Sequence, residues 1–403
     1  MYRLGILETH PIQYKAPWFR LLSRRPELEV TVFYCMLPDA GQQGADFGVS
    51  FQWDQPLLEG YRHRVLRNRA RTPSMSRFNG CDTPDIRAVV RDEGFDAFLA
   101  NGWVVRSCLQ LLWACRRYGV PCLVRGESNL MRRRARWKGV LLRLLLRQYS
   151  AVLAIGAANR EFYRALGVEE SRLFFAPYGV DNEGFEVQAA SLGARRQALR
   201  EAWGIPRDAI AFLFCGKFVA KKRPRDVLDA LRMHDLAARG RGPGRLHVLM
   251  AGDGPLRGEC EAFAAQHRLP VTFAGFLNQT EVARAYVAAD CLVLPSDAGE
   301  TWGLVVNEAM ACGRPAVVSD QVGCRADLVV PGRTGDVVPC GDCAALAAAL
   351  TVLAADPARL ARMGEQAREH VRGYSFDRLT EGTLAAVAHA CRRRRPSSAG
   401  VHE

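Results

Sequence analysis

Short apolar runs alternate with longer amphipathic segments along most of this chain. In the first half, the runs that predict buried strands are residues 2–8 (YRLGILE), 28–35 (LEVTVFYC), 97–101 (AFLAN), 121–126 (PCLVRG) and 151–156 (AVLAIG). A second series comprises residues 209–216 (AIAFLFCG), 246–254 (LHVLMAGDG), 271–276 (VTFAGF), 291–296 (CLVLPS) and 314–320 (RPAVVSD). Apolar runs of this length, separated by helical patterns, predict parallel sheets that are covered by helices.

Two such series predict the α/β class, with two doubly wound, Rossmann-like domains. The segment 182–194 (NEGFEVQAASLGA) loses strand character and turns small and polar, so we expect the boundary there. This gives a first domain over 1–187 and a second over 188–375. Residues 376–403 are expected to form a final helix and a basic tail.

The composition is that of a soluble globular protein, with 49% hydrophobic and 24% charged residues. No apolar stretch reaches the roughly 18 residues of a transmembrane helix, and the N-terminal run is too short for a signal peptide. The 13 cysteines are odd in number and scattered, which suits reduced thiols in the cytoplasm. Cys340 and Cys343 have CxxC spacing, but a second pair is missing, so we predict no metal site.

Positive charge is concentrated in the first half of the chain. Residues 1–200 hold 30 Lys and Arg against 19 Asp and Glu, whereas residues 201–403 hold 25 against 23. This asymmetry suggests an anionic partner: nucleic acid, an acidic membrane surface or a phosphorylated substrate. The alternative is an arginine-rich composition without a partner. No nucleic-acid-binding signature occurs in the sequence, so nucleic acid is not the partner that we expect.

Residues 131–149 predict a basic amphipathic helix with seven basic residues and no acidic one. Arg132, Arg136, Arg143 and Arg147 share one stripe, beside an apolar face of Trp137, Val140, Leu141, Leu144 and Leu145. Such a helix lies in an anionic membrane interface, peripheral to the inner face of the membrane. The alternative is a helix whose apolar face packs into the core.

The run GETWGLVVNE at 299–308 contains a carboxylate near its start and another at its end, Glu300 and Glu308. We expect Thr301, Trp302 and Gly303 to open a helix, so that their backbone N–H groups receive a phosphate. Carboxylates on either side accept hydrogen bonds from sugar hydroxyls. An ordinary helix produces this spacing by chance, so the run alone is weak evidence.

Two further loops follow predicted strands. CGKFVAKKRP at 215–224 contains Lys217 and Lys222, two cations of the kind that neutralise a diphosphate, and Gly216, which permits close backbone approach. AGDGPL at 251–256 is a tight turn around Gly252. A solvated basic loop and a common turn are the alternatives.

Together these motifs resemble the retaining glycosyltransferases of the GT-B fold, in the large family with a glutamate–seven residues–glutamate motif (group 1, family 4). The resemblance runs from about Pro177 to Tyr374 and includes PYGVDNEGF, GKFVAKK, AGDGPL, FAGFLNQTEV, the glutamate run and PGRTGDVVP. It implies two Rossmann-like domains facing a cleft, with a last helix that crosses back to the first domain. The arginines at 392–395 would then join the basic first half.

The resemblance also implies a role for each matching residue. Glu300 would bind hydroxyls of the donor sugar, Glu308 the ribose, and Lys217 and Lys222 the pyrophosphate. The remaining residues implied in donor binding are Gly216, Gly252, Phe276, Leu277, Thr301, Trp302, Gly303 and Leu304. Members of the family need no metal cofactor. Position 217 is usually arginine in the family, so here the compact ammonium group of lysine replaces a planar guanidinium group.

The acceptor side is expected in the first domain. LETHPIQYKAP at 7–17 replaces the glycine-rich loop of many relatives and presents His10, Gln13 and Tyr14. NGW at 101–103 and RGESN at 125–129 add Trp103, Arg125 and Glu127, where relatives often have a histidine. His10 and Glu127 are candidates for moving or orienting a proton; alternatively, His10 is bonded within its own loop.

We therefore expect a retaining transferase that uses a nucleotide sugar, with UDP favoured. Its acceptor would be a lipid-linked or phosphorylated component of envelope polysaccharide or glycolipid. Glycosylation of a soluble natural product or other small molecule is the alternative. A nucleic-acid-binding protein and a non-catalytic nucleotide-sugar-binding relative are less consistent with the intact motif residues.

Overall fold

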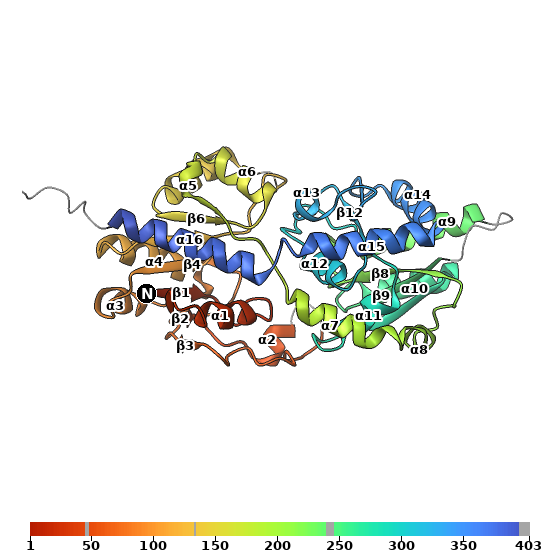
Figure 1. Cartoon of the computed structure of the whole chain (residues 1–403), viewed down its shortest axis with the longest axis horizontal. Coiled ribbons are helices and arrows are strands. Elements are labelled where there is room, and N and C mark those ends of the chain that lie inside the picture. Colours follow the sequence, from red (N-terminus) through yellow and green to blue (C-terminus); the bar gives the residue numbers. More distant parts are fainter. Residues whose placement is uncertain (45–47, 133, 239–245, 395–403) are drawn as a thin grey trace, which may run out of the picture. The chain divides into compact units, whose positions relative to one another are not determined.

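The computed structural model describes residues 1–44, 48–132, 134–238 and 246–394. The chain divides into two compact units (Figure 1). Unit 1 comprises Met1–Pro38, Pro56–Tyr178 and Phe376–Glu403, and unit 2 comprises Asp39–Gln55 and Gly179–Ser375.

Unit 1 contains, among its described residues, a parallel sheet in the order β3-β2-β1-β4-β5-β6-β7. Its strands are β1 (Tyr2–Glu8), β2 (Leu28–Tyr34), β3 (Arg62–Val65), β4 (Ala97–Asn101), β5 (Cys122–Arg125), β6 (Ala151–Ala154) and β7 (Leu173–Phe175). Its helices are α1 (Ala16–Ser23), η1 (Phe78–Gly80), α3 (Ile86–Asp92), α4 (Arg106–Arg117), α5 (Arg136–Leu146), α6 (Ala157–Ala165), η2 (Glu170–Arg172) and α16 (Phe376–Arg394).

The sheet of unit 1 separates two apolar cores because successive side chains of a strand point to opposite faces. On β1, Leu4 and Ile6 pack with α1 and α16, whereas Leu7 packs with α3, α4 and α6. Helix α16 buries Leu379 and Val387 in the first of these cores and packs against α1, β6 and β7. The predicted return of the last helix to the first domain is therefore confirmed. Arg395 and the rest of the basic tail lie outside the described residues.

Unit 2 contains a second parallel sheet, in the order β10-β9-β8-β11-β12-β13 among its described residues. Its strands are β8 (Ile210–Cys215), β9 (Leu246–Ala251), β10 (Val271–Gly275), β11 (Cys291–Leu294), β12 (Ala316–Ser319) and β13 (Gly335–Val338). Its helices are α2 (Ala40–Gly44), α7 (Asn182–Gly193), α8 (Arg196–Ala202), η3 (Ala220–Lys222), α9 (Pro224–Ala238), α10 (Arg257–His267), α11 (Val282–Ala288), α12 (Leu304–Ala311), α13 (Arg325–Leu328), α14 (Cys343–Ala354) and α15 (Pro357–Val371).

The division between the units differs from the expected boundary at 187/188. Residues 182–193 form helix α7, and the Asp181 carboxylate caps its first turn by accepting a 3.0 Å hydrogen bond from the Gly184 N–H. The chain therefore changes unit at Tyr178, before this helix. The structure also assigns Asp39–Gln55, from the first half of the sequence, to unit 2.

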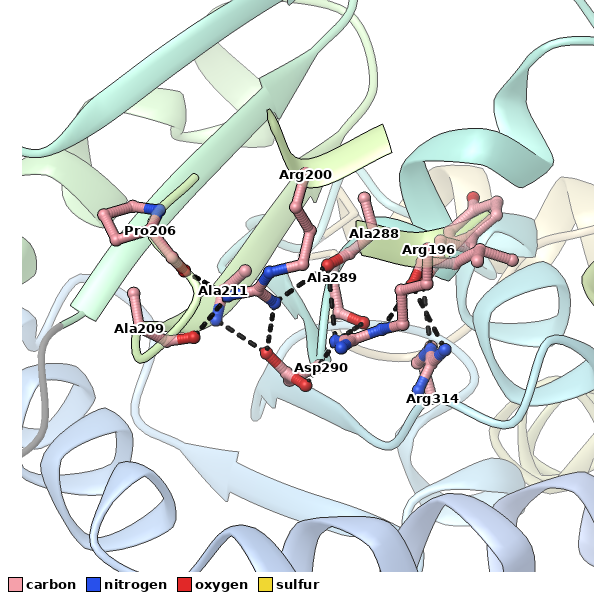
Figure 2. A network of polar contacts seen from close by, with 11 residues as sticks. Arg196, Arg200, Pro206, Ala209, Ala211, Ala288, Ala289, Asp290 and Arg314 are labelled. Atoms are coloured by element: carbon pink, nitrogen blue, oxygen red, sulfur yellow. Dashed lines mark hydrogen bonds and ion pairs between the residues drawn. The ribbon is translucent and has the colours of Figure 1, made fainter. Parts of the chain in front are cut away.

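An arginine network lies at the amino ends of β8 and β11, two neighbouring strands of the second sheet (Figure 2). Arg200 is 2% exposed and donates to Asp290 Oδ2 at 3.2 Å and to the carbonyls of Pro206 and Ala288 at 2.8 and 3.2 Å. Burial lowers the pKa of its guanidinium, and the Asp290 carboxylate opposes that shift.

The same network caps the carboxyl end of α11. Arg314 donates to the carbonyls of Tyr286 and Val287 at 2.9 and 3.2 Å, and Arg196 donates to Val287 at 2.9 Å (Figure 2). The last carbonyls of a helix have no intrahelical donors, so these cations stabilise the helix end. The network therefore determines where the last turn of α11 lies.

Candidate active site

The candidate donor site lies at the carboxyl edge of the second sheet. Strands β8 and β11 are neighbours there, although they are separated in sequence by β9 and β10. After β8 the chain continues to β9 on one side of this pair, and after β11 it continues to β12 on the other side. Ligands of open α/β sheets bind at such a switch point. The loops after β8 and β11 contain Lys217, Lys222, Glu300 and the start of α12.

Lys222 and Glu300 form an ion pair between these two loops, through the ammonium group and Oε2. Both side chains are 12% exposed. Withdrawing two charges from water is costly unless they are paired, so each of these residues stabilises the other in its position. The pair places a cation, which is able to bind a phosphate group, beside a carboxylate, which is able to accept hydrogen bonds from hydroxyl groups.

Backbone contacts hold these two loops together. The Asp297 N–H donates to the Lys221 carbonyl at 2.9 Å, and the Glu300 N–H donates to the Asp297 carbonyl at 2.9 Å. The Gly323 N–H, from the loop after β12, donates to the Glu300 carbonyl at 3.1 Å. Glu300 is therefore fixed by its backbone as well as by Lys222.

Gly216 and Gly252 follow β8 and β9 and pack backbone to backbone. Their φ angles are 153° and 130°, and a Cβ atom on Gly252 would lie 1.9 Å from the Gly216 carbonyl oxygen. A Cβ on Gly216 would lie 3.7 Å from Cε of Lys222. Glycine is thus required where these turns approach each other beside Lys222.

The start of the helix after Glu300 differs from the prediction. Helix α12 begins at Leu304, with Gly303 as its N-cap at φ 102°, so Thr301 and Trp302 precede the helix. The first-turn N–H groups, at Leu304 and Val305, have no acceptor within the helix. The Trp302 indole is 3% exposed and donates to Asn307 Oδ1 at 2.8 Å, so its ring belongs to the core.

Glu308 lies in α12 and is 2% exposed. The Tyr286 hydroxyl, from α11, donates to Glu308 Oε2 at 2.6 Å. The nearby Cys215 thiol has its pKa raised to about 12 by burial and by the charge of Glu308, so it stays neutral. Tyr286 was not among the predicted site residues, and its place just before the predicted strand 291–296 was the only signal in the sequence.

The remaining predicted donor residues lie along the same edge. Lys217 is half-buried after β8, and Leu277 is half-buried after β10. The Phe276 ring contacts that of Phe51 with a centroid distance of 4.3 Å. The Gly252 N–H donates to the Gly275 carbonyl at 2.7 Å, which ties the ends of β9 and β10 together.

At the carboxyl edge of the sheet in unit 1, a buried carboxylate that was not predicted from the sequence lies among the expected acceptor residues. Glu8 ends β1, is 2% exposed and pairs with the Lys15 ammonium at 2.9 Å. Asn101, which ends β4, donates to Glu8 Oε1. Burial raises the pKa of Glu8, and Lys15 opposes that shift. An acidic residue that ends a predicted buried strand was the available signal.

The loop after β1 presents the first expected acceptor residues. His10 Nδ1 lies 2.9 Å from Thr9 Oγ1. Burial, together with the charge of Lys15, lowers the pKa of His10 to about 4, so the ring is neutral near pH 7. Gln13 is buried and Tyr14 is half-buried.

Arg125 and Glu127 share Tyr178 as a neighbour. The Tyr178 hydroxyl donates to Glu127 Oε1, and the Arg125 guanidinium lies 4.2 Å from the centre of the Tyr178 ring. Arg125 is 4% exposed. Trp103 stacks on Phe162 of α6 at 6.5 Å, and its ring also lies against Gly126, where a Cβ atom would be 2.3 Å from Trp103 Cζ3.

Among the described residues, no group of three or more His, Cys, Asp or Glu lies together as a metal site would require. No single helix there has the length and hydropathy to cross a membrane, and one bent pair, α14 with α15, meets that test by length and composition only.

Comparison with known proteins assigns the family. Residues 195–370 match the model of "Glycosyl transferases group 1", and residues 20–179 match that of the "Glycosyl transferase 4-like domain". Together the two matches cover every described strand of both sheets except β1, and the chain therefore belongs to this family of GT-B glycosyltransferases.

Its relatives include D-inositol 3-phosphate glycosyltransferase 2 of Catenulispora acidiphila, 34% identical over 57% of this chain and 52% of that protein. A GDP-mannose-dependent phosphatidylinositol dimannoside mannosyltransferase of Mycobacterium tuberculosis is 28% identical over 59% of this chain and 57% of that protein. The chain thus spans little more than half the length of these relatives. HepE of Anabaena, solved with UDP and glucose, shares the fold with a TM-score of 0.70 at 16% identity, covering 96% of this chain and all of HepE.

Proposed function

We propose that this protein is a retaining glycosyltransferase that moves a sugar from a nucleotide diphosphate, with UDP favoured, to an acceptor in cell-envelope polysaccharide or glycolipid synthesis. The observation that supports it most is the buried Lys222–Glu300 pair between the loops after β8 and β11. A cation and a carboxylate at a switch point suit a ligand that joins a phosphate to a hydroxylated ring.

In this proposal, Lys222 and Lys217 neutralise the diphosphate, together with the first N–H groups of α12. Glu300 accepts hydrogen bonds from the sugar and Glu308 from the ribose. The bond between C1 and the phosphate oxygen breaks, the acceptor oxygen bonds to C1 on the same face, and the acceptor proton passes to the departing phosphate. The lysines supply the charge that a metal would otherwise provide, so transfer should proceed in EDTA.

The acceptor would bind in unit 1, near His10, Gln13, Tyr14, Trp103, Arg125 and Glu127. A neutral His10 is able to accept a proton or a hydrogen bond, and Tyr178 orients Glu127. These two residues are our candidates for orienting the acceptor hydroxyl.

The outer face of α5 supports an acceptor at a membrane. The helix is shorter than predicted, Arg136–Leu146, and Arg133 lies outside the described residues. The side chains of Trp137, Val140, Leu141 and Leu144 are 61%, 59%, 57% and 49% exposed. Leu142, Leu145 and Leu146 pack inward, so the outer apolar face is not needed for the core. We propose that it enters an anionic bilayer surface while the flanking arginines contact headgroups.

A soluble acceptor is the second candidate, because the relative from C. acidiphila is named for D-inositol 3-phosphate. The two candidates are distinguished by incubating the protein and labelled UDP-glucose, UDP-N-acetylglucosamine or GDP-mannose with anionic vesicles of bacterial lipid or with soluble sugar phosphates. Label in the lipid phase, with an anomeric configuration equal to that of the donor, supports the proposal. Label only in soluble product favours the second candidate, and inverted product contradicts retention.

A further inference from the structure

A segment from the first half of the sequence covers part of the candidate donor site. Residues 48–55, here called the strap, belong to unit 2. The Phe51 ring contacts Phe276 at a centroid distance of 4.3 Å and an interplanar angle of 37°. Trp53 packs edge-on against Phe51 at 4.9 Å. Three aromatic rings thus lie in a row beyond the end of β10.

Polar contacts fasten the strap to the loop after β10. The Asn278 side-chain amide donates to the Gln52 carbonyl at 2.9 Å. The Thr280 N–H donates to Asp54 Oδ2 at 3.1 Å, and the Thr280 hydroxyl donates to the same oxygen. A Cβ atom on Gly48 would lie 4.0 Å from Cα of Gly254, so the strap also approaches the turn after β9. Its position is therefore determined on both sides of the aromatic row.

The strap lies where the donor base is expected. A nucleotide whose phosphates bind at the ends of β8 and β11 extends along the carboxyl edge of the sheet. On the β8 side, this edge continues through β9 to β10 and reaches Phe276. Phe51, Trp53 and Phe276 are each half-buried, so none of the three is fully enclosed in the core of unit 2.

We propose that Phe51 and Trp53 form a wall of the base subsite, and that the planar base of the donor nucleoside diphosphate stacks on this aromatic row. The inference rests on the proposed donor site and adds to it residues that lie outside the donor-site motifs. Aromatic rings bind any base through its π face, so the wall contributes affinity and the backbone of the loop after β10 is left to select the base.

The test compares two ligands that differ only in the base. Affinities of UDP and of ribose 5-diphosphate, which has the sugar and both phosphates but no base, are measured by calorimetry. Phe51→Ala should weaken UDP binding about 5- to 100-fold and leave the affinity for ribose 5-diphosphate unchanged. Phe51→Tyr should restore UDP binding. Phe78→Ala, at an exposed phenylalanine of unit 1, is the matched control.

Three results would overturn the proposal. Equal weakening of both ligands would make the strap a structural support, and unchanged UDP affinity would place the base elsewhere. Tighter UDP binding would mean that Phe51 competes with the base for Phe276. In each of these cases the wild-type protein still binds UDP, so the proposed donor site survives. If the wild type binds neither of these ligands, and neither GDP nor ADP, the donor site and the wall both fail.

Discussion

The hydroxyl of Tyr286 donates a 2.6 Å hydrogen bond to Oε2 of Glu308, and both side chains are buried. Arg314 holds the backbone carbonyl of the same tyrosine at 2.9 Å. The arginine network at the amino ends of β8 and β11 is thereby connected, through the last turn of α11, to the Glu308 carboxylate, which is proposed to bind ribose. A rotation of this carboxylate would break the bond, so Tyr286 fixes its orientation.

Replacement of this tyrosine should weaken donor binding. In Tyr286→Phe the carboxylate loses a hydrogen bond to a charged group, worth about 1.5–3 kcal/mol, and we expect nucleotide affinity to fall about 10-fold or more. The measurement is calorimetric titration with UDP. Tyr149→Phe is the matched control, because the Tyr149 hydroxyl is buried and has no hydrogen-bond partner among the described residues. Equal affinities for both variants would contradict a positioning role.

Substitutions of Lys222 and Glu300 should have strongly non-additive effects on stability, whereas the double variant should regain no activity. Lys222→Met or Glu300→Gln alone leaves a poorly compensated partner in a largely buried site, and we expect each to lower the free energy of unfolding by about 2–4 kcal/mol. The double variant should recover much of that loss while transferring no sugar. Denaturant unfolding and transfer assays measure the two properties, with Lys221→Ala as an exposed neighbouring control. An active double variant would refute the proposed site.

The outer face of α5 should control membrane binding. Replacing Trp137 and Leu141 with serine removes apolar area worth about 1.5–3 kcal/mol per side chain when it is buried, so co-sedimentation with anionic vesicles should fall at least about 10-fold. Val187 and Val352 are 63% and 56% exposed in unit 2, and their replacement with serine is the control. If both double variants sediment like the wild type, α5 does not bind the membrane.

The network around Arg200 should contribute to stability independently of the donor site. Arg200→Ala leaves the Asp290 carboxylate with one guanidinium fewer and strips donors from buried carbonyls, so we expect a loss of about 3–5 kcal/mol in unfolding free energy. Arg207→Ala removes a surface ion pair with Glu201 and should cost less than about 1 kcal/mol. Chemical denaturation measures the unfolding free energy of both variants. Similar losses in Arg200→Ala and Arg207→Ala would mean that the buried network contributes no more than a surface ion pair.

Strands with mostly apolar sequences could be predicted from the sequence, and β1, β2, β8, β9 and β11 illustrate this. The strands that were missed lack this signal. Strand β3, with the sequence RHRV, is mostly exposed at a sheet edge, and β7 is only three residues long. Strand β13 follows the turn at 331–334 and pairs at the other edge of the second sheet. Edge strands bury less surface, so their composition is less constrained.

The candidate site was predictable where a motif determines local geometry, as for Glu300 after its strand. The start of α12 was predicted too early, because Gly303 adopts a positive φ and begins the helix later. Tyr286 and the strap were missed for another reason. Their contacts, to Glu308 and to Phe276, join distant parts of the chain, and no local pattern specifies such pairs.

The most direct test of the proposed donor site is calorimetric titration of the protein with UDP, GDP and ADP in EDTA. We predict saturable binding of one nucleotide, with UDP favoured, that is lost in Lys222→Ala and retained in Lys221→Ala. Folding of each variant is checked by its unfolding transition. Failure of all three nucleotides to bind the folded wild-type protein, or undiminished binding by Lys222→Ala, would contradict the proposal.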